Sequence, residues 1–444
     1  MESIVSSLFL ALTGIVYLAV AWWASRGVSS QTDYVLGNRS FNTFSISLTL
    51  IATQLGAGMI FGTAAESYHK GFSGLAYILG MAAGLIILGL GVGARLRSLN
   101  ISTTAELFET KYNSANLRKV ASVISILTMG GILAAQIVAS KQLFSSLFDL
   151  SSWWLIAFWL LIIGYTMFGG IKAVIATDIL QVLLIVAVFS VVLFMVIPAR
   201  DIPAVLANST QGKLLPLFSE GFFAALIAPV LFSLIEQDLA QRFFAAKNQR
   251  VATISALIAA AFLLVFAAIP MLLGIYANMI GISFSAGQSP LVLLLQARLP
   301  GFAMTSVACA LLAAICSTAD SLLGAASSNL IADFGTINQR YALWVSRLIT
   351  FLLGVLALLV AWNFDNVIGV IIKSYEISIS ALFIPLIIAM YSKNPSPLGA
   401  KLSVCGGFLS FLAASSLANS WPPTALALLV SALAFWAGTI IERR

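Results

Sequence analysis

Apolar stretches of about 20 residues recur along the whole of this 444-residue chain and constrain its fold more than any other feature. A helix of about 20 apolar residues can cross the hydrocarbon core of a bilayer, where only helices and closed barrels satisfy the backbone. Thirteen such spans are predicted at residues 3–25, 43–65, 72–94, 120–148, 152–169, 173–198, 219–244, 252–280, 302–332, 342–362, 366–391, 398–418 and 423–441. We therefore expect an all-α polytopic membrane protein.

The composition supports this interpretation and indicates a direction of insertion. Hydrophobic residues make up 60% of the chain and charged residues only 9%, whereas about a quarter of a soluble domain is charged. With the N-terminus outside, 17 of the 23 Lys and Arg residues, Arg242 among them, fall on the cytoplasmic side, as the positive-inside rule requires. We predict a cytoplasmic C-terminus, a plasma-membrane location (the inner membrane of a bacterium), and no nucleic-acid partner or obligate protein partner.

The residues that most enzymes require are not arranged for catalysis in this sequence. The three cysteines, Cys309, Cys316 and Cys405, lie in apolar stretches without metal-ligand spacing. The single His69 stands beside Lys70 in a loop-like stretch, and the sequence contains no phosphate-binding loop. We therefore do not expect an enzyme.

Polar side chains interrupt the ninth predicted span, in the sequence Ala314-Ile-Cys-Ser-Thr-Ala-Asp-Ser321. Ionisable groups at membrane depth are costly and mark functional sites. Because successive helical residues rotate by about 100°, Ala314, Ser317, Thr318 and Ser321 form one stripe, flanked by Asp320. Such hard oxygen atoms suit a small hard cation. The alternative is that each hydroxyl bonds the carbonyl one turn earlier; with an acid in the group, we favour an ion site.

Two spans carry helix-breaking residues in corresponding places. Gly56 and Gly58 weaken the second span, and Pro229 removes a backbone hydrogen bond from the seventh. Paired interruptions of this kind point to the binding site of a transporter built from inverted repeats. The repeats would cover 43–198 and 219–391, each with five spans and a broken first helix.

Four further motifs occur in order along the chain. They are Asp33-Tyr-Val-Leu-Gly-Asn-Arg39, Gly169-Gly-Ile-Lys-Ala-Val-Ile-Ala-Thr-Asp-Ile-Leu-Gln181, Gln241-Arg-Phe-Phe-Ala-Ala-Lys247 and Ser317-Thr-Ala-Asp-Ser321. Together they resemble the sodium:solute symporter family. The resemblance implies a LeuT-like fold in a single transporter domain over 1–444, with one extra helix at 3–25, a five-plus-five inverted repeat and two further helices at 398–441.

The resemblance also implies two ion sites. The common sodium site of the family would use the backbone carbonyls of Ala52, Leu55 and Ala314 and the hydroxyls of Ser317 and Thr318. A neutral shell suits a monovalent ion that must bind and leave in every cycle. A second site, for sodium or a proton, would use Asp178, Ser317, Asp320 and Ser321. For Asp178 the alternative role is to cap the start of its helix.

For the solute, Gly62-Thr-Ala-Ala-Glu66 and Glu376 are similar to the choline-transporter branch of the family. The positions that hold the aromatic cage of that branch are here Gln54, Met81 and Glu236, so the cage is absent and choline is not expected. The predicted solute-binding residues are Gln54, Gly58, Met81, Glu236, Tyr375 and Glu376. Their acids favour an amine-bearing cation, a zwitterion or an amino acid. Glu236 has an alternative place in a cytoplasm-side polar cluster with Asp238 and Arg242.

We therefore predict a symporter that imports a small polar organic solute with sodium by alternating access, with sodium, the solute and the lipid bilayer as its partners. Two other interpretations stay open: the same scaffold coupled to protons, and a membrane sensor that binds a solute without transporting it. Residues 285–299 are expected to form a helix over the outer face, either as a gating lid or as a packed connector.

Overall fold

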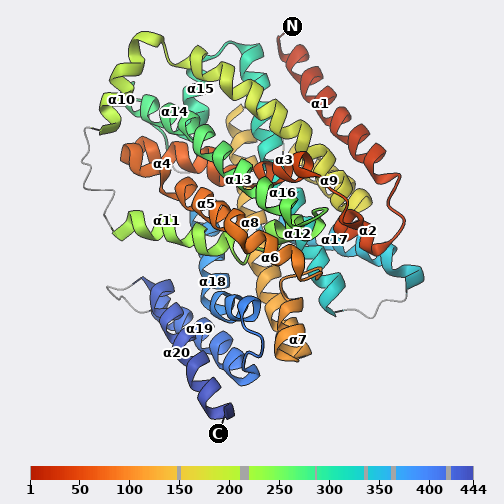
Figure 1. Ribbon diagram of the computed structural model, residues 1–444. Coiled ribbons are helices and arrows are strands. Elements are labelled where there is room, and N and C mark those ends of the chain that lie inside the picture. Colours follow the sequence, from red (N-terminus) through yellow and green to blue (C-terminus); the bar gives the residue numbers. More distant parts are fainter. Residues whose placement is uncertain are drawn as a thin grey trace.

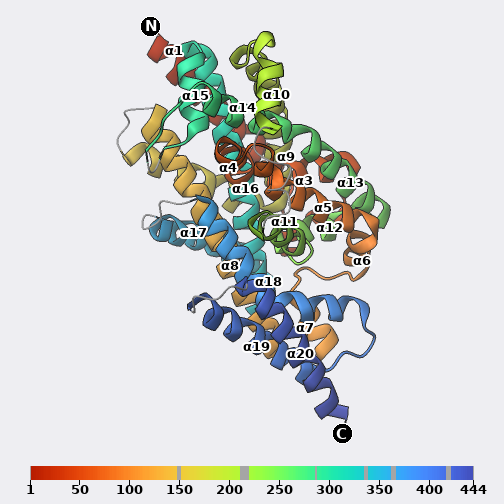
Figure 2. The ribbon, with the colours of Figure 1, turned by 90° about the vertical axis from the view of Figure 1, so that its left-hand side faces the viewer.

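The computed structural model describes residues 2–147, 152–210, 220–285, 288–334, 339–361, 367–416 and 422–443. Within these ranges the fold is built from helices, and strand pairing is limited to an isolated bridge between Phe41 and Ala246. The all-α prediction is therefore confirmed. Helix α1 (Glu2–Ser25) and helix α20 (Pro423–Arg443) lie at opposite ends of the molecule in both views (Figures 1 and 2).

The predicted spans coincide with helices. The unbroken ones, besides α1 and α20, are α8 (Ala115–Leu147), α16 (Gly301–Phe334), α17 (Gln339–Ala361), α18 (Val367–Tyr391) and α19 (Pro397–Ser416). The third span comprises α5 (Ala76–Ile87), the π-helix η4 (Leu88–Val92) and α6 (Gly93–Ser98), and the eighth comprises α13 (Gln249–Phe266) and α14 (Ala268–Met279). By length and composition alone, nine helical segments in the described ranges qualify as membrane spans, so the count of thirteen stays a prediction. The predicted span ends at 148, 219, 362, 366 and 418 lie outside the described residues.

The second predicted span is broken where the glycines indicated. Helix α3 (Thr43–Gln54) ends at Leu55, and after an irregular turn the chain continues as the π-helix η2 (Gly58–Gly62) and as α4 (Thr63–Lys70). Leu55 has φ −76° and ψ 20°, which ends the regular α3 ladder. The break therefore lies inside the protein, at a buried part of the chain.

The seventh span is also broken, but not at the proline. Helix α11 (Glu220–Ser233) passes through Pro229, and the chain leaves the helical conformation only at residues 234–236, before α12 (Gln237–Ala245). The Ser233 hydroxyl donates to the Pro229 carbonyl at 2.7 Å, a common bond of serine to the carbonyl one turn earlier. Glu236, with ψ 127°, is extended and ends the ladder. The predicted break is thus corrected by between one and two helical turns.

The fifth and sixth predicted spans form one helical element, α9 (Ser152–Val196), with a kink at Gly170. Its 45 residues would extend for roughly 68 Å as a straight helix, about twice the hydrocarbon thickness of a bilayer. Gly170 has φ 55° and ψ −151°, and a Cβ atom there would overlap the Tyr34 backbone oxygen. Glycine is required because the kink brings the segment before α3 against α9.

Helix α16 lies at the centre of the fold. All residues from 307 to 323 are buried, and the helix packs against α8, α9 and α1. A helix buried on all sides must pair its polar groups within the protein, so the polar stripe on α16 is necessarily an internal one. The predicted helix near 285–299 is present as α15 (Pro290–Arg298), packed against α14 and α4; whether it gates the outer face stays open.

Candidate functional site

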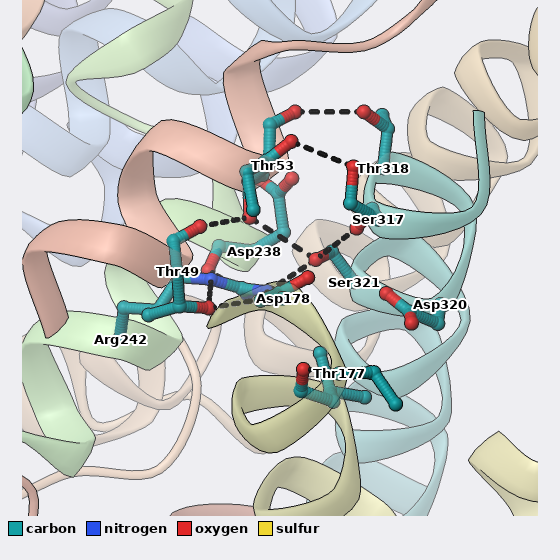
Figure 3. A network of polar contacts seen from close by, with 12 residues as sticks. Thr49, Thr53, Thr177, Asp178, Asp238, Arg242, Ser317, Thr318, Asp320 and Ser321 are labelled. Atoms are coloured by element: carbon teal, nitrogen blue, oxygen red, sulfur yellow. Dashed lines mark hydrogen bonds and ion pairs between the residues drawn. The ribbon is translucent and has the colours of Figure 1, made fainter. Parts of the chain in front are cut away.

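The polar stripe of α16 faces the break in α3 (Figure 3). The Ser317 hydroxyl is 2.9 Å from the Ala52 carbonyl oxygen and 3.0 Å from that of Ala314. The Thr318 hydroxyl donates to the Thr53 carbonyl at 2.9 Å. We call Ala52, Thr53, Ala314, Ser317 and Thr318 the neutral cluster, because all of their contacting groups are uncharged.

Gly56 allows this close approach. A Cβ atom at Gly56 would overlap the Thr318 hydroxyl oxygen. Glycine is therefore required here, because the non-helical segment after α3 lies directly against α16. The Ala57 amide, freed from the helix by the break, donates to the Gln136 side-chain oxygen on α8 at 3.0 Å. The break is therefore fixed from two sides, by α16 and by α8.

The neutral cluster can hold a small monovalent cation. Its two hydroxyl and several carbonyl oxygen atoms are hard donors of the kind that sodium accepts. Four of the five predicted sodium ligands, Ala52, Ala314, Ser317 and Thr318, are brought together here. Leu55 lies at the end of α3, next to them in the chain, where its carbonyl no longer belongs to a regular α-helix. The role of these residues as ligands remains a proposal.

A second polar group lies one turn further along α16 (Figure 3). The Arg242 guanidinium donates to the Ser321 hydroxyl and, at 3.2 Å, to the Thr49 hydroxyl. Its nearest nitrogen is 3.9 Å from Asp178 Oδ2, and that same oxygen accepts a hydrogen bond from Thr49. We call Thr49, Asp178, Arg242, Asp320 and Ser321 the charged cluster.

The position of Arg242 corrects the sequence prediction. The positive-inside count places this arginine on the cytoplasmic side, where Glu236, Asp238 and Arg242 could form a polar cluster. Instead the residue is 1% exposed and lies in the interior, and its contact with Asp238 is to the backbone carbonyl, at 2.7 Å. The reason is the break at 234–236, which makes α12 a separate short helix whose polar side turns towards α3 and α16.

The two acids of the predicted second ion site have different surroundings. Asp178 lies eight residues beyond the kink at Gly170, past the first turn where helix capping acts, so its carboxyl does not cap the helix. Asp320 accepts a hydrogen bond from the Tyr165 hydroxyl at 2.7 Å. Among the described residues, the Oδ1 atoms of Asp178 and Asp320 are buried without a hydrogen-bond partner. Both are oxygens that an ion or a proton would satisfy.

A small cavity lies beside the neutral cluster, on the side of α5, α8 and α18. Its volume is about 20 Å³, room for roughly one water molecule, so a solute needs the helices to move apart. Five predicted solute residues line it: Gln54, Gly58, Met81, Glu236 and Tyr375. Its other lining residues were not predicted from the sequence; they are Thr53, Gly56, Met59, Tyr77, Ile132, Gln136, Asp238, Thr318, Leu322 and Ile371.

Glu376 does not line this cavity. Its carboxylate accepts a hydrogen bond from the Thr424 hydroxyl on α20 at 3.0 Å. Neighbouring helical residues point about 100° apart, so when Tyr375 faces the cavity Glu376 faces the C-terminal helices. In this structure Glu376 thus joins α18 to α20, away from the cavity that the other five predicted residues line.

Two tyrosines form an aromatic wall of the cavity. The hydroxyls of Tyr77 on α5 and Tyr375 on α18 are 2.8 Å apart, and their rings are nearly parallel. Phe232 stacks on Tyr375 with ring centroids 4.0 Å apart. Tyr77 lies four residues before Met81, one turn away on the same helix face, and this spacing is the signal that could have identified it.

The cytoplasm-facing side of the charged cluster, in the predicted orientation, is closed by the short helix α2 (Gln31–Leu36). The Gln241 amide donates to the Val35 carbonyl and to the Ser328 hydroxyl, both at 2.8 Å. Lys172 pairs with the buried Asp33 at 2.6 Å. A space of about 10 Å³ remains between α2, the Gly170 kink and Asp320.

Comparisons with known proteins agree with this architecture. The sodium:solute symporter family matches residues 34–407. The structure of a sodium-coupled sialic acid symporter in its substrate-bound outward-open state has a TM-score of 0.84 at 18% identity, covering 99% of this chain and 97% of that one. Mhp1, a nucleobase-cation-symport-1 family transporter in a closed conformation with bromovinylhydantoin bound, has a TM-score of 0.59 at 14% identity, with 92% and 94% covered.

MhsT, in complex with L-phenylalanine, has a TM-score of 0.55 at 16% identity, covering 89% of this chain and 98% of that one. Likenesses at these identities establish the fold, which is LeuT-like as predicted. The ligands named for these proteins are theirs alone.

Proposed function

The chain belongs to the sodium:solute symporter family. We propose that it imports a small amine-bearing organic solute together with sodium by alternating access. The family supplies the sodium coupling and the membrane location. The amine, the site residues and the orientation with the N-terminus outside are our proposal. One observation carries it: Thr318 belongs to the neutral cluster and also lines the acid-containing cavity.

The neutral cluster is proposed as the common sodium site. Sodium would replace hydrogen bonds that the Ser317 and Thr318 hydroxyls now donate to backbone carbonyls at 2.9 Å. Because those bonds join α3 to α16, the ion would tie the broken helix to the central one. That link between two helices is what an ion must control if it is to drive alternating access.

The cavity is proposed as the solute site. Its lining contains two carboxyl groups, from Glu236 and Asp238, the amides of Gln54 and Gln136, and the two tyrosine rings. A buried carboxylate without a cationic partner costs several kcal/mol, so a neutral sugar would bind at a penalty that an ammonium group avoids. The faces of Tyr77 and Tyr375 add cation–π attraction.

Uptake by purified protein in liposomes tests the proposal. Radiolabelled amines, amino acids, sugars and vitamins are offered under an imposed sodium gradient, an imposed proton gradient and no gradient. We expect accumulation of an amine-bearing compound that requires inward-directed sodium. Accumulation driven by the proton gradient alone would favour the proton-coupled scaffold, and saturable binding without accumulation would favour a sensor. Strong competition by a neutral sugar would refute the amine assignment.

A further inference from the structure

The solute cavity contains more negative charge than its surroundings balance. Glu236 and Asp238 are 7% and 1% exposed, and both line the same cavity of about 20 Å³. Among the described residues, neither carboxyl has a salt bridge, and Asp238 accepts a hydrogen bond from the Leu239 amide at 2.9 Å. Two carboxylates buried around so small a space repel each other, and such repulsion favours a shared proton.

Among the described residues, Arg242 is the cation close to these acids, and its side chain is already engaged elsewhere. Arg242 directs its side chain to Thr49 and Ser321, and its charge lies 3.9 Å from Asp178. Towards Asp238 it contacts only the backbone carbonyl. The groups that face the acids from α5 and α18 are the uncharged phenols of Tyr77 and Tyr375, and from α3 the amide of Gln54. Within the described part of the chain, neither carboxyl of the acid pair is therefore bonded to a cation.

An independent feature indicates that a ligand completes this site. The side-chain amide of Gln54 is 6% exposed and lines the same cavity, yet among the described residues it has no hydrogen-bond partner. An unpaired buried amide costs free energy unless a ligand or water satisfies it. Gln54 and the acid pair thus face one space, from two different broken helices.

We propose that Glu236 and Asp238 hold one proton between them in the solute-free cavity, and that the ammonium group of the solute takes its place. This inference rests on the proposed amine transport. The displaced proton leaves to water on the side from which the solute enters, and a proton is taken up again when the solute leaves on the other side. Each cycle then carries one proton in the direction opposite to the solute, and the charge of the cavity stays constant.

Infrared spectroscopy of the purified full-length protein tests the shared proton without any solute. A protonated carboxyl has a carbonyl stretching band that a carboxylate lacks. We expect the wild-type spectrum minus that of the E236Q/D238N double variant to contain this band. Its absence from the difference spectrum would overturn the proposal. Retention of the sodium-induced rise in melting temperature shows that the double variant is folded.

Proton release tests the exchange. Methylammonium, ethanolamine, choline, 1,4-diaminobutane and lysine are added to weakly buffered protein with a pH-sensitive dye, with glucose as the neutral control. We expect at least one ammonium probe to release a proton and to remove the infrared band. The matched variant E376Q, whose acid lies outside the cavity, is expected to behave like wild type, whereas E236Q and D238N release none.

If every ammonium probe leaves the band in place, the exchange is wrong. If probes release a proton but sodium neither stabilises the protein nor affects uptake, the exchange stands and the proposed sodium coupling fails. If sodium-driven amine uptake occurs with no proton release, the proposed function stands and the exchange is refuted.

Discussion

The neutral and charged clusters lie one turn apart on α16. The first buries uncharged hydroxyl and carbonyl groups, whereas the second buries charged side chains. In the neutral cluster, the hydroxyls of Ser317 and Thr318 donate to carbonyls that the break in α3 exposes. In the charged cluster, Arg242 lies 3.9 Å from Asp178, and within the described residues one oxygen each of Asp178 and Asp320 has no partner.

The difference bears on how each cluster can receive a cation. An ion that enters the neutral cluster replaces hydrogen bonds worth about 1 kcal/mol each, so it can bind and leave readily. An ion that enters the charged cluster meets a resident guanidinium, which already supplies a positive charge to Asp178. We therefore expect the first sodium ion to bind in the neutral cluster, and a second one to bind only if Arg242 gives way.

The largest effect is expected from the double substitution Ser317→Ala and Thr318→Ala. If each hydroxyl contributes ~1.5–3 kcal/mol as a contact to a charged group, sodium affinity falls by roughly 10²- to 10⁴-fold. The rise in melting temperature with sodium, measured against potassium at equal ionic strength, reports this loss. An unchanged sodium dependence would remove the neutral cluster from consideration as an ion site.

The next largest effect is expected from Arg242→Gln. Removing one member of a buried charged pair destabilises a protein by about 3–5 kcal/mol, here because Asp178 keeps its charge without a partner. The combined variant with Asp178→Asn should lose less than the sum of the two single losses. Chemical denaturation in micelles measures the coupling. Strict additivity would show that Arg242 and Asp178 do not interact.

A smaller effect is expected from Asp320→Asn, because an amide oxygen can still accept the hydrogen bond from Tyr165. We expect the protein to fold and to bind one sodium ion fewer at saturation, as measured with radioactive sodium, because the negative charge that would compensate a second ion is gone. A stoichiometry equal to that of wild type would leave Asp320 with a structural role.

The smallest effect is expected from Gly56→Ala, which pushes a methyl group against Thr318 without removing a ligand. Overpacking of this kind costs about 1–3 kcal/mol, and we expect it mainly as weaker sodium binding in the same melting assay. Gly324→Ala is the matched control, since a methyl group there meets no atom within 4 Å. Equal sodium affinity in both variants would argue against the proposed contact between the break and α16.

The neutral cluster could be predicted from the sequence because its determinants are local. Glycines weaken a helix wherever it lies, and hydroxyls at helical spacing share one face in any helix. The charged cluster could not be predicted in full. Arg242 is basic and near the end of an apolar stretch, a pattern typical of cytoplasmic residues; only the chain break at 234–236 turns it inward.

The cavity was predicted in part for the same reason. Gln54 and Glu236 adjoin the two breaks, and breaks in membrane helices are bordered by ligands. Tyr375 and Glu376 were equally good candidates in sequence, because the side of α18 that faces the cavity depends on how α19 and α20 pack against the other side. Asp238 stands one turn before Arg242 in the sequence, but it is its backbone carbonyl that accepts a hydrogen bond from this arginine.

Thr318 has a single hydroxyl hydrogen and can therefore donate it to one acceptor at a time. In this structure the hydroxyl donates to the Thr53 carbonyl. An ion held by the same oxygen atom would repel the hydrogen and turn it away, and Thr318 also lines the cavity. The cavity could then gain one more hydrogen-bond donor, beside the tyrosine hydroxyls and glutamine amides that already line it. Sodium would thus change which chemical groups the transporter can recognise, in addition to holding two helices together.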